Sequence, residues 1–383
     1  MRIFMTGATG FVGRATVLRL RREGHDIVAW VRTPNKAKSI LGSEAELLPV
    51  SCDENTLQDC LNGCDAIINL AGEPVAGKRW TAAYKNRLIT SRVALTQRIV
   101  DALEKIDNKP QVLISASAVG YYGNQGDKEL TESSPRGTGF LATLCEDWEN
   151  AALKAQSLGV RTCVLRIGVV LGQGGGALQK MLPIFQAGLG GALGNGKQYF
   201  PWIHLHDVVG AIYFTLSENT AQGAFNLAAP EAATSKTFGK ALARVIGRPS
   251  FMPAPALAIQ MVLGEAARIV LDSQRVKPAK LQTAGFEFQY PGLDMALRAV
   301  LLDTQTNIEP IAAQTPEPCA PESTYLKKRR PKYLLNTQHH PIKTMCKYLQ
   351  LIQISLGYRH YLPHHHYPNH KNIFQNHQLY CWL

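Results

Sequence analysis

Three glycines near the start of the chain have the spacing of a phosphate-binding loop. Gly7, Gly10 and Gly13 follow the short apolar run 1–5 and precede an amphipathic run over 14–23. This order predicts a strand, a tight loop and a helix. Gly7 would take positive φ, Gly10 would let the backbone approach a pyrophosphate, and Gly13 would let helix and strand pack closely. A glycine-rich turn without a ligand is the alternative. The residues that complete the predicted dinucleotide cradle are Thr9, Phe11 and Val12.

A cation follows the second predicted strand, 26–31, at Arg32. A chain that binds NAD(H) normally presents Asp or Glu at this point to the ribose 2′-hydroxyl. A guanidinium favours a 2′-phosphate instead, through bidentate charge-assisted hydrogen bonds. We therefore expect NADP(H) as the cofactor, with NADPH binding at least tenfold tighter than NADH, which corresponds to about 1.4 kcal/mol.

Composition limits the class of protein. The 383 residues are 45% apolar and 18% charged, which is typical of a globular protein with a sizeable core. The chain enters a predicted strand at once and has no long apolar run, so we expect no transit peptide, no membrane partner and a cytoplasmic location. The eight cysteines form no Cys-x-x-Cys pair and are expected to be free thiols. Part of the net charge of +12 lies beyond residue 301, so we expect no nucleic-acid partner.

Strand and helix patterns continue to alternate after Arg32. Predicted strands over 46–50, 66–72 and 112–117 alternate with predicted helices over 55–61 and 81–105. Successive right-handed βαβ units place helices on both faces of a parallel sheet. The fold class predicted is α/β, a doubly wound Rossmann sheet completed by strands from the second half of the chain.

Several motifs follow the glycine loop in a fixed order. They are Asn69-Leu70-Ala71-Gly72, the serine-rich segment 115–123, the segments 166–172 and 200–208, and the closing region 251–288. Together they resemble the extended short-chain dehydrogenase/reductases of the NAD-dependent epimerase/dehydratase superfamily. The last region resembles the small C-terminal helical domain (DUF1731-like) of one epimerase-family branch. The resemblance implies that Leu70 and Ala71 lie along the adenosine side of the cofactor. It also implies that Val170 belongs to the cofactor site.

The family's chemistry uses a serine that holds the substrate oxygen, and a Tyr-x-x-x-Lys pair that moves the proton and grips the cofactor ribose. By resemblance, Ser117 fits the serine role. The Tyr-x-x-x-Lys pair is missing from this sequence. Phe140 or Leu141 stands at the tyrosine position, and Leu144 or Cys145 stands at the lysine position. This departure puts ordinary alcohol or sugar redox chemistry in doubt.

Three other side chains are candidates for the proton transfer and the cofactor contact of the missing Tyr-x-x-x-Lys pair. Tyr121 or Tyr122, close to Ser117, could supply the proton, and packing at the strand end is the alternative for Tyr122. Arg92 replaces the asparagine that extended relatives usually carry on the long helix. It could contact the cofactor's phosphates, and a solvated helix arginine is the alternative.

The substrate half contains two glycine-rich segments. The first, 173–177, predicts a mobile lid or an anion-accepting turn, and the second, 188–197, predicts a shaped loop over a pocket. We assign segments 173–205 and 225–248 to the substrate side. His204 and Asp207 are two residues apart on either side of a predicted helix start. We expect Asp207 to cap that helix, and we expect no metal site.

We expect three parts in the chain. Residues 1–248 form the NADP-binding domain, residues 249–301 a small helical domain docked on it, and residues 302–383 a poorly ordered, basic and histidine-rich tail. For the tail, metal binding, nuclear targeting and RNA contact are the alternatives.

Two functions remain open from the sequence. The first is an atypical NADP(H)-dependent oxidoreductase or epimerase acting on an unidentified small molecule, with Ser117 and Tyr121 or Tyr122 at its site. The second is a non-catalytic NADP(H)-binding regulator with a protein partner, because some relatives carry a cell-division-inhibitor label. The missing Tyr and Lys favour the regulator, whereas the strand-end serine and the glycine-rich loops favour the enzyme. A homodimer is compatible with both.

Overall fold

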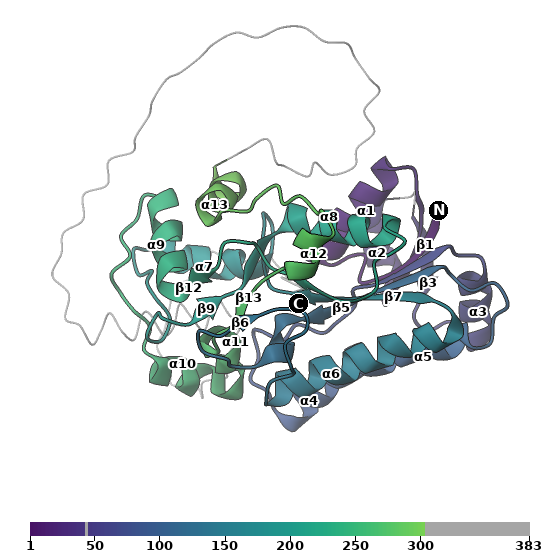
Figure 1. Ribbon diagram of the computed structural model, residues 1–383, viewed down its shortest axis with the longest axis horizontal. Helices are drawn as coiled ribbons and strands as arrows, with labels where there is room; N and C mark the ends of the chain where they lie inside the picture. Colours follow the sequence, from purple (N-terminus) through teal and green to yellow (C-terminus); the bar gives the residue numbers. More distant parts are fainter. Residues whose placement is uncertain (43–44, 303–383) are drawn as a thin grey trace, which may run out of the picture.

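A parallel sheet of seven strands forms the centre of the computed structural model, which describes residues 1–42 and 45–302 (Figure 1). The Rossmann prediction is confirmed. In sheet order the strands are β11 (Gly223–Leu227), β7 (Arg161–Ile167), β5 (Val112–Ala118), β4 (Ala66–Asn69), β1 (Arg2–Thr6), β2 (Asp26–Val31) and β3 (Glu46–Pro49).

The first strand occupies the middle of this sheet. Phe4 of β1 lies between Val28 of β2 and Ile67 of β4, and Ile67 is in register with Leu113 of β5. Both faces of β1 are buried, which explains why its sequence is a continuous apolar run rather than an alternating one. The glycine loop that follows β1 therefore lies at the centre of the sheet's carboxyl edge.

Helices cover both faces of the sheet (Figure 1). One face carries α1 (Phe11–Arg22), α2 (Pro34–Leu41) and α8 (Leu205–Ser217), and the other carries α3 (Glu54–Asn62), α5 (Leu95–Leu103) and α6 (Phe140–Leu153). Successive residues of β1 serve different cores, since Ile3 and Met5 pack in the first and Phe4 packs in the second. This alternation with period two is the ordinary geometry of a strand.

The long helix predicted over 81–105 is interrupted. It begins as α4 (Ala82–Ile89), widens into a π-helical turn at Thr90–Ala94 and continues as α5. The wide turn carries Arg92, whose residue surface is only 3% exposed. The alternative of a solvated helix arginine is therefore wrong. Such π-turns occur frequently at functional sites.

The residues after β5 add short strand pairs and helices beside the carboxyl edge of the sheet. The pairs are β8 (Val169–Leu171) with β10 (Trp202–His204), β9 (Tyr199–Phe200) with β12 (Ala233–Thr234), and β6 (Glu129–Leu130) with β13 (Arg275–Val276). The helices are α7 (Gly176–Gln186) and α9 (Ser235–Val245). Short 3₁₀ turns occur at Val119–Tyr122, Lys154–Leu158 and Gly264–Ala267.

The C-terminal segment packs along the body rather than around a core of its own. Its helices are α10 (Ala256–Leu263), α11 (Arg268–Leu271), α12 (Ala279–Thr283) and α13 (Leu293–Leu301). Leu281 joins the core beneath α1 and α8, Leu297 packs with residues of α9, and Ile259 joins a cluster with Trp80. The predicted boundary between residues 248 and 249 stays a prediction.

Asp207 does not cap its helix, so that prediction is wrong. The helix α8 begins at Leu205, and the Nδ1 atom of His204 accepts a hydrogen bond from the His206 backbone N–H at 3.1 Å. The Asp207 carboxylate instead accepts the backbone N–H groups of Gln289 at 2.7 Å and Tyr290 at 3.1 Å. Asp207 therefore fastens the C-terminal segment to the body.

Two further findings concern the described part of the chain. No helix within residues 1–42 and 45–302 is both long and apolar enough to cross a membrane. The cysteines in this part are free thiols, as predicted, at positions 52, 60, 64, 145 and 163. The predictions for the tail lie outside the described residues.

Candidate dinucleotide site and adjoining cavity

The loop between β1 and α1 accommodates only glycine at two of its three predicted positions. Gly7 has φ of +68°, and a Cβ atom on it would lie 2.7 Å from the Leu70 carbonyl group. A Cβ atom on Gly13 would lie 2.0 Å from the carbonyl oxygen of Gly7. The N–H of Gly10 donates to that same oxygen at 2.9 Å, which closes the turn. These contacts fit the cradle that a pyrophosphate requires.

The helix α1 begins directly after this loop. Its first residue is Phe11, and no side chain caps its N-terminus. The positive end of the helix dipole therefore faces the loop and favours a phosphate. Thr9 lies within the loop, and Phe11 and Val12 form the first turn of α1.

A buried network holds the strand end next to the loop in place. The Thr6 hydroxyl donates to Oδ1 of Asn69 at 2.7 Å and accepts the backbone N–H of Ala71 at 3.0 Å. The Asn69 amide donates to the Thr96 hydroxyl at 2.8 Å. Because these bonds link β1, β4 and α5, they fix Leu70 and Ala71 directly beside Gly7.

Arg32 lies at the end of β2, where the sequence predicts a contact with a 2′-phosphate. Its side chain is 80% exposed, and Nη1 is 3.9 Å from Oε2 of Glu73. This distance describes a loose ion pair, which contributes little in an exposed position. The guanidinium therefore remains accessible to an anion.

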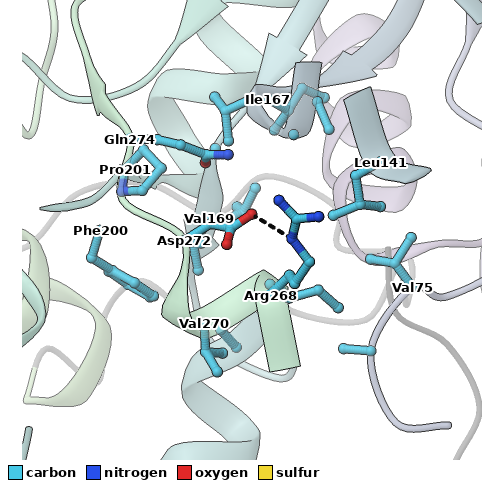
Figure 2. Close-up of a pocket in the computed structure, with 18 of the residues that line it drawn as sticks. Val75, Leu141, Ile167, Val169, Phe200, Pro201, Arg268, Val270, Asp272 and Gln274 are labelled. Carbon is cyan, nitrogen blue, oxygen red and sulfur yellow. Dashed lines mark hydrogen bonds and ion pairs between the residues drawn. The ribbon is translucent and has the colours of Figure 1, made fainter. Parts of the chain in front are cut away.

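A cavity of about 300 Å³ opens at the carboxyl ends of β5 and β7 (Figure 2). Three of the predicted cofactor residues line it, namely Phe11, Arg92 and Val170. The strand ends contribute Ala118 and Ile167 to its wall, and most of the other lining side chains are apolar. The cavity therefore extends from the glycine loop toward the second half of the chain.

The positions at which the family resemblance predicts Tyr and Lys form an apolar wall of this cavity. Phe140, Leu141, Leu144 and Cys145 all line it from α6. Burial, and then the nearby Glu149 carboxylate, raise the pKa of Cys145 to about 12, so the group is a neutral thiol at physiological pH. None of these side chains relays a proton there.

Ser117, Tyr121 and Tyr122 do not line the cavity. The Ser117 hydroxyl is fully buried and donates to Oε1 of Glu149 at 2.6 Å. The Tyr122 hydroxyl donates to Oδ1 of Asn226 at 2.7 Å, and Arg166 donates to it at 2.9 Å. Burial raises the pKa of Tyr122, although Arg166 opposes this shift. The structure agrees with the packing alternative for Tyr122.

These side chains belong to a buried framework around an ion pair. Arg166 and Glu149 are joined at 2.8 Å, and both side chains are almost completely buried. The guanidinium of Arg166 also stacks over the Tyr121 ring, with 3.5 Å from Cζ to the ring centroid. The catalytic roles predicted for Ser117 and the two tyrosines therefore gain no support from the geometry.

Arg92 is held at the edge of the cavity by backbone oxygens. Its Nη2 atom donates to the Glu73 carbonyl at 2.8 Å, and its guanidinium lies 5.2 Å from the Trp148 ring centroid. Burial lowers the pKa of Arg92, which nevertheless stays a cation at neutral pH. A Cβ atom on Gly72 would lie 2.9 Å from this guanidinium, so the glycine leaves room for it.

Sequence reasoning missed the charged cavity residues Lys180, Arg268 and Asp272, and the amide of Gln274. Lys180 comes from α7, and the others come from α11 and the residues after it. Figure 2 shows Arg268, Asp272 and Gln274 projecting into the same space. Their sequence context is that of ordinary helix and loop residues, so no local signal identifies them.

The doubly wound sheet, the glycine loop at its centre and the cavity beside that loop define a dinucleotide-binding protein of the Rossmann type. The chain belongs to the NAD dependent epimerase/dehydratase family, which matches residues 3–228. Residues 254–300 match a second family, the domain of unknown function DUF1731.

Known relatives match about four-fifths of the chain. An Arabidopsis thaliana protein, the epimerase family protein SDR39U1 homolog, chloroplastic, is 41% identical over 303 residues, which is 79% of this chain and 87% of that protein. The Mus musculus epimerase family protein SDR39U1 is 36% identical over 306 residues, covering 79% of this chain and all of the mouse protein. A crystal structure of human SDR39U1 with NADPH has a TM-score of 0.69 and 32% identity, covering 78% and 99% of the two chains.

Proposed function

We propose that this protein is an NADP(H)-dependent oxidoreductase of the epimerase family that acts on a small molecule bound in the cavity. One observation carries the proposal: Phe11, next to the glycine loop, and Arg268, from the C-terminal segment, line the same cavity. A cofactor on the glycine loop would therefore reach the space in which a second molecule binds.

The choice of NADP(H) rests on Arg32. Its exposed guanidinium lies at the end of β2, where an acidic residue would favour NAD(H). The human relative is described in complex with NADPH. A guanidinium can bind a 2′-phosphate through two parallel hydrogen bonds, and this chemistry supports the same preference.

The bound nicotinamide would supply or accept a hydride. The chain's own task is to orient the substrate, to exclude water and to handle any proton. The apolar wall at Leu141 and Cys145 excludes water but moves no proton. Lys180 lines the cavity with an amine whose pKa is lowered by burial, and we assign the proton exchange to it.

Calorimetric titration of the full chain tests the cofactor assignment. We expect NADPH to bind at least tenfold tighter than NADH, and we expect Arg32→Asp to reverse the preference. Arg248→Asp is the control, because Arg248 is an exposed arginine just after α9, away from β2. Equal affinities of the wild type for the two nucleotides would contradict the role of Arg32.

A screen of metabolites that follows NADPH absorbance tests turnover. We expect Lys180→Met to lower the rate with any active compound and to leave NADPH affinity unchanged.

The second candidate is a regulator that binds NADP(H) without turnover, which the apolar wall at Leu141 and Cys145 favours. NADPH binding without hydride transfer to any molecule that occupies the cavity would support the regulator and exclude the enzyme.

A further inference from the structure

We propose that the cavity binds a compact apolar molecule with a carboxylate group, and that Arg268 holds this carboxylate. The inference rests on the proposed function, because it names the substrate class of the same cavity. It assigns recognition of the charged group to the C-terminal segment rather than to the Rossmann sheet.

The first support is the geometry of Arg268. Its Nε atom donates to Oδ2 of Asp272 at 3.2 Å, and its side chain is 40% exposed. Within residues 1–42 and 45–302, neither Nη1 nor Nη2 forms a hydrogen bond with the protein. Figure 2 shows the guanidinium in the cavity, beside Leu141. Two Nη atoms presented together match the two oxygens of a carboxylate.

The second support is the backbone that faces this guanidinium. Gly139 has φ of +99°, and a Cβ atom on it would lie 2.4 Å from Nη1 of Arg268. Gly139 is also the N-cap residue of α6, which has no capping side chain. A cation beside the positive end of a helix is unfavourable, and an anion bound there would compensate both charges.

The third support is the charge of the cavity. Among the described residues that line it, the cations are Arg92, Lys180 and Arg268, and the carboxylate is that of Asp272. Backbone oxygens bind Arg92 and Asp272 pairs with Arg268, but the cations still outnumber the carboxylate, and a neutral ligand would leave this excess of positive charge in an apolar surrounding. A monoanionic ligand reduces the excess.

The walls and the size define the rest of the ligand. Leu141, Ile167, Val169 and Val270 line the same cavity as Arg268 and give it apolar walls (Figure 2). The volume of about 300 Å³ lies at the lower end of the range for ligand pockets, roughly 300–1,000 Å³. Since the cavity would also receive the nicotinamide, the remaining space suits a compact apolar acid and does not enclose a nucleotide sugar.

Calorimetry with octanoate and its neutral analogue octanamide tests the proposal on the full chain saturated with NADP⁺. We expect octanoate to bind at least tenfold tighter than octanamide. In Arg268→Gln, octanoate should lose at least tenfold in affinity, whereas octanamide should bind as it does to the wild type. Arg268→Lys keeps the charge without the paired Nη atoms and should lose part of the affinity. Arg248→Gln is the surface control and should change neither value.

Three outcomes would overturn the proposal: equal affinity for octanoate and octanamide, no effect of Arg268→Gln on octanoate, or displacement of octanoate by UDP-glucose together with tighter UDP-glucose binding. If Arg268→Gln unfolds, the comparison between the wild type and Arg268→Lys still decides. NADPH binding without octanoate binding would refute this inference and leave the proposed function standing. If NADPH does not bind, the proposed function fails. The same comparison of octanoate with octanamide, made on the cofactor-free protein and on Arg268→Gln, then tests whether Arg268 binds the carboxylate.

Discussion

The hydroxyl of Ser117 donates a 2.6 Å hydrogen bond to Oε1 of Glu149, away from the cavity that its neighbour Ala118 lines. Glu149 is in turn bound by Arg166 through both carboxylate oxygens, at 2.9 and 2.8 Å. The serine that the motif order suggests for substrate binding thus completes a buried ion pair.

Ser117→Ala should therefore affect stability rather than cofactor binding. Removing the donor leaves a buried carboxylate oxygen with one partner fewer, which should lower the free energy of unfolding by about 1–3 kcal/mol. Urea denaturation measures this change, and calorimetry should show NADPH affinity within a factor of two of the wild type. The control is Ser39→Ala, since Ser39 is an exposed serine in α2. A variant of unchanged stability that no longer acts on a substrate would restore the catalytic role of Ser117.

Comparing Gly7→Ala with Gly24→Ala distinguishes the backbone cost of replacing a glycine from an effect on cofactor binding. Both glycines have positive φ, +68° and +78°, so each substitution should cost roughly 1–2 kcal/mol in the free energy of unfolding. Only at Gly7 would the new Cβ atom collide, at 2.7 Å from the Leu70 carbonyl group, whereas nothing lies within 4 Å at Gly24. We expect NADPH binding to fall at least tenfold in Gly7→Ala alone. Equal affinities of the two variants would show that the loop does not bind the cofactor.

His204 should make the protein sensitive to acid. Burial is the main cause that lowers its pKa from 6.5 to about 4, and its ring stacks on Tyr290 with 3.8 Å between centroids. Because the fold disfavours the protonated form of His204, the folded state is most stable at a pH above the unfolded pKa, where the imidazole is neutral in both states. This stabilisation is lost as the pH falls from 6.5 toward 4, and it amounts to about 3 kcal/mol.

His204→Asn keeps a side-chain acceptor for the helix N-terminus but does not titrate. Denaturation curves at pH 6.5 and pH 4 should therefore show a smaller loss of stability on acidification than in the wild type. The matched control is His206→Asn, because His206 is exposed two residues further along. If His204→Asn loses as much stability on acidification as the wild type does, the acid sensitivity belongs to another group.

A chain that ends at Asp303 should bind NADPH with the affinity of the full chain. The hydrophobic cores of the described residues end with Val300 and Leu301 of α13, so this truncation removes none of them. We expect the midpoint of thermal unfolding to change by only a few degrees. Aggregation of the truncated chain would show that later residues pack on the body.

Local sequence was sufficient to predict the fold and the conformation of the glycine loop. The apolar run of β1, the glycine spacing and the alternation of strands and helices each depend on neighbours within a few residues, so they could be predicted. Arg32 could be placed for the same reason, because it directly follows the strand β2.

Only the tertiary structure decided which side chains reach the cavity. Successive side chains of a strand point to opposite sides, so a single position separates Ser117, bound to Glu149, from Ala118 in the cavity wall. Lys180 and Arg268 come from helices far apart in the sequence, and they line one cavity because the C-terminal segment packs along the body instead of folding on itself. Residue spacing along the chain does not predict which distant side chains line the same cavity, because the packing of distant segments decides it.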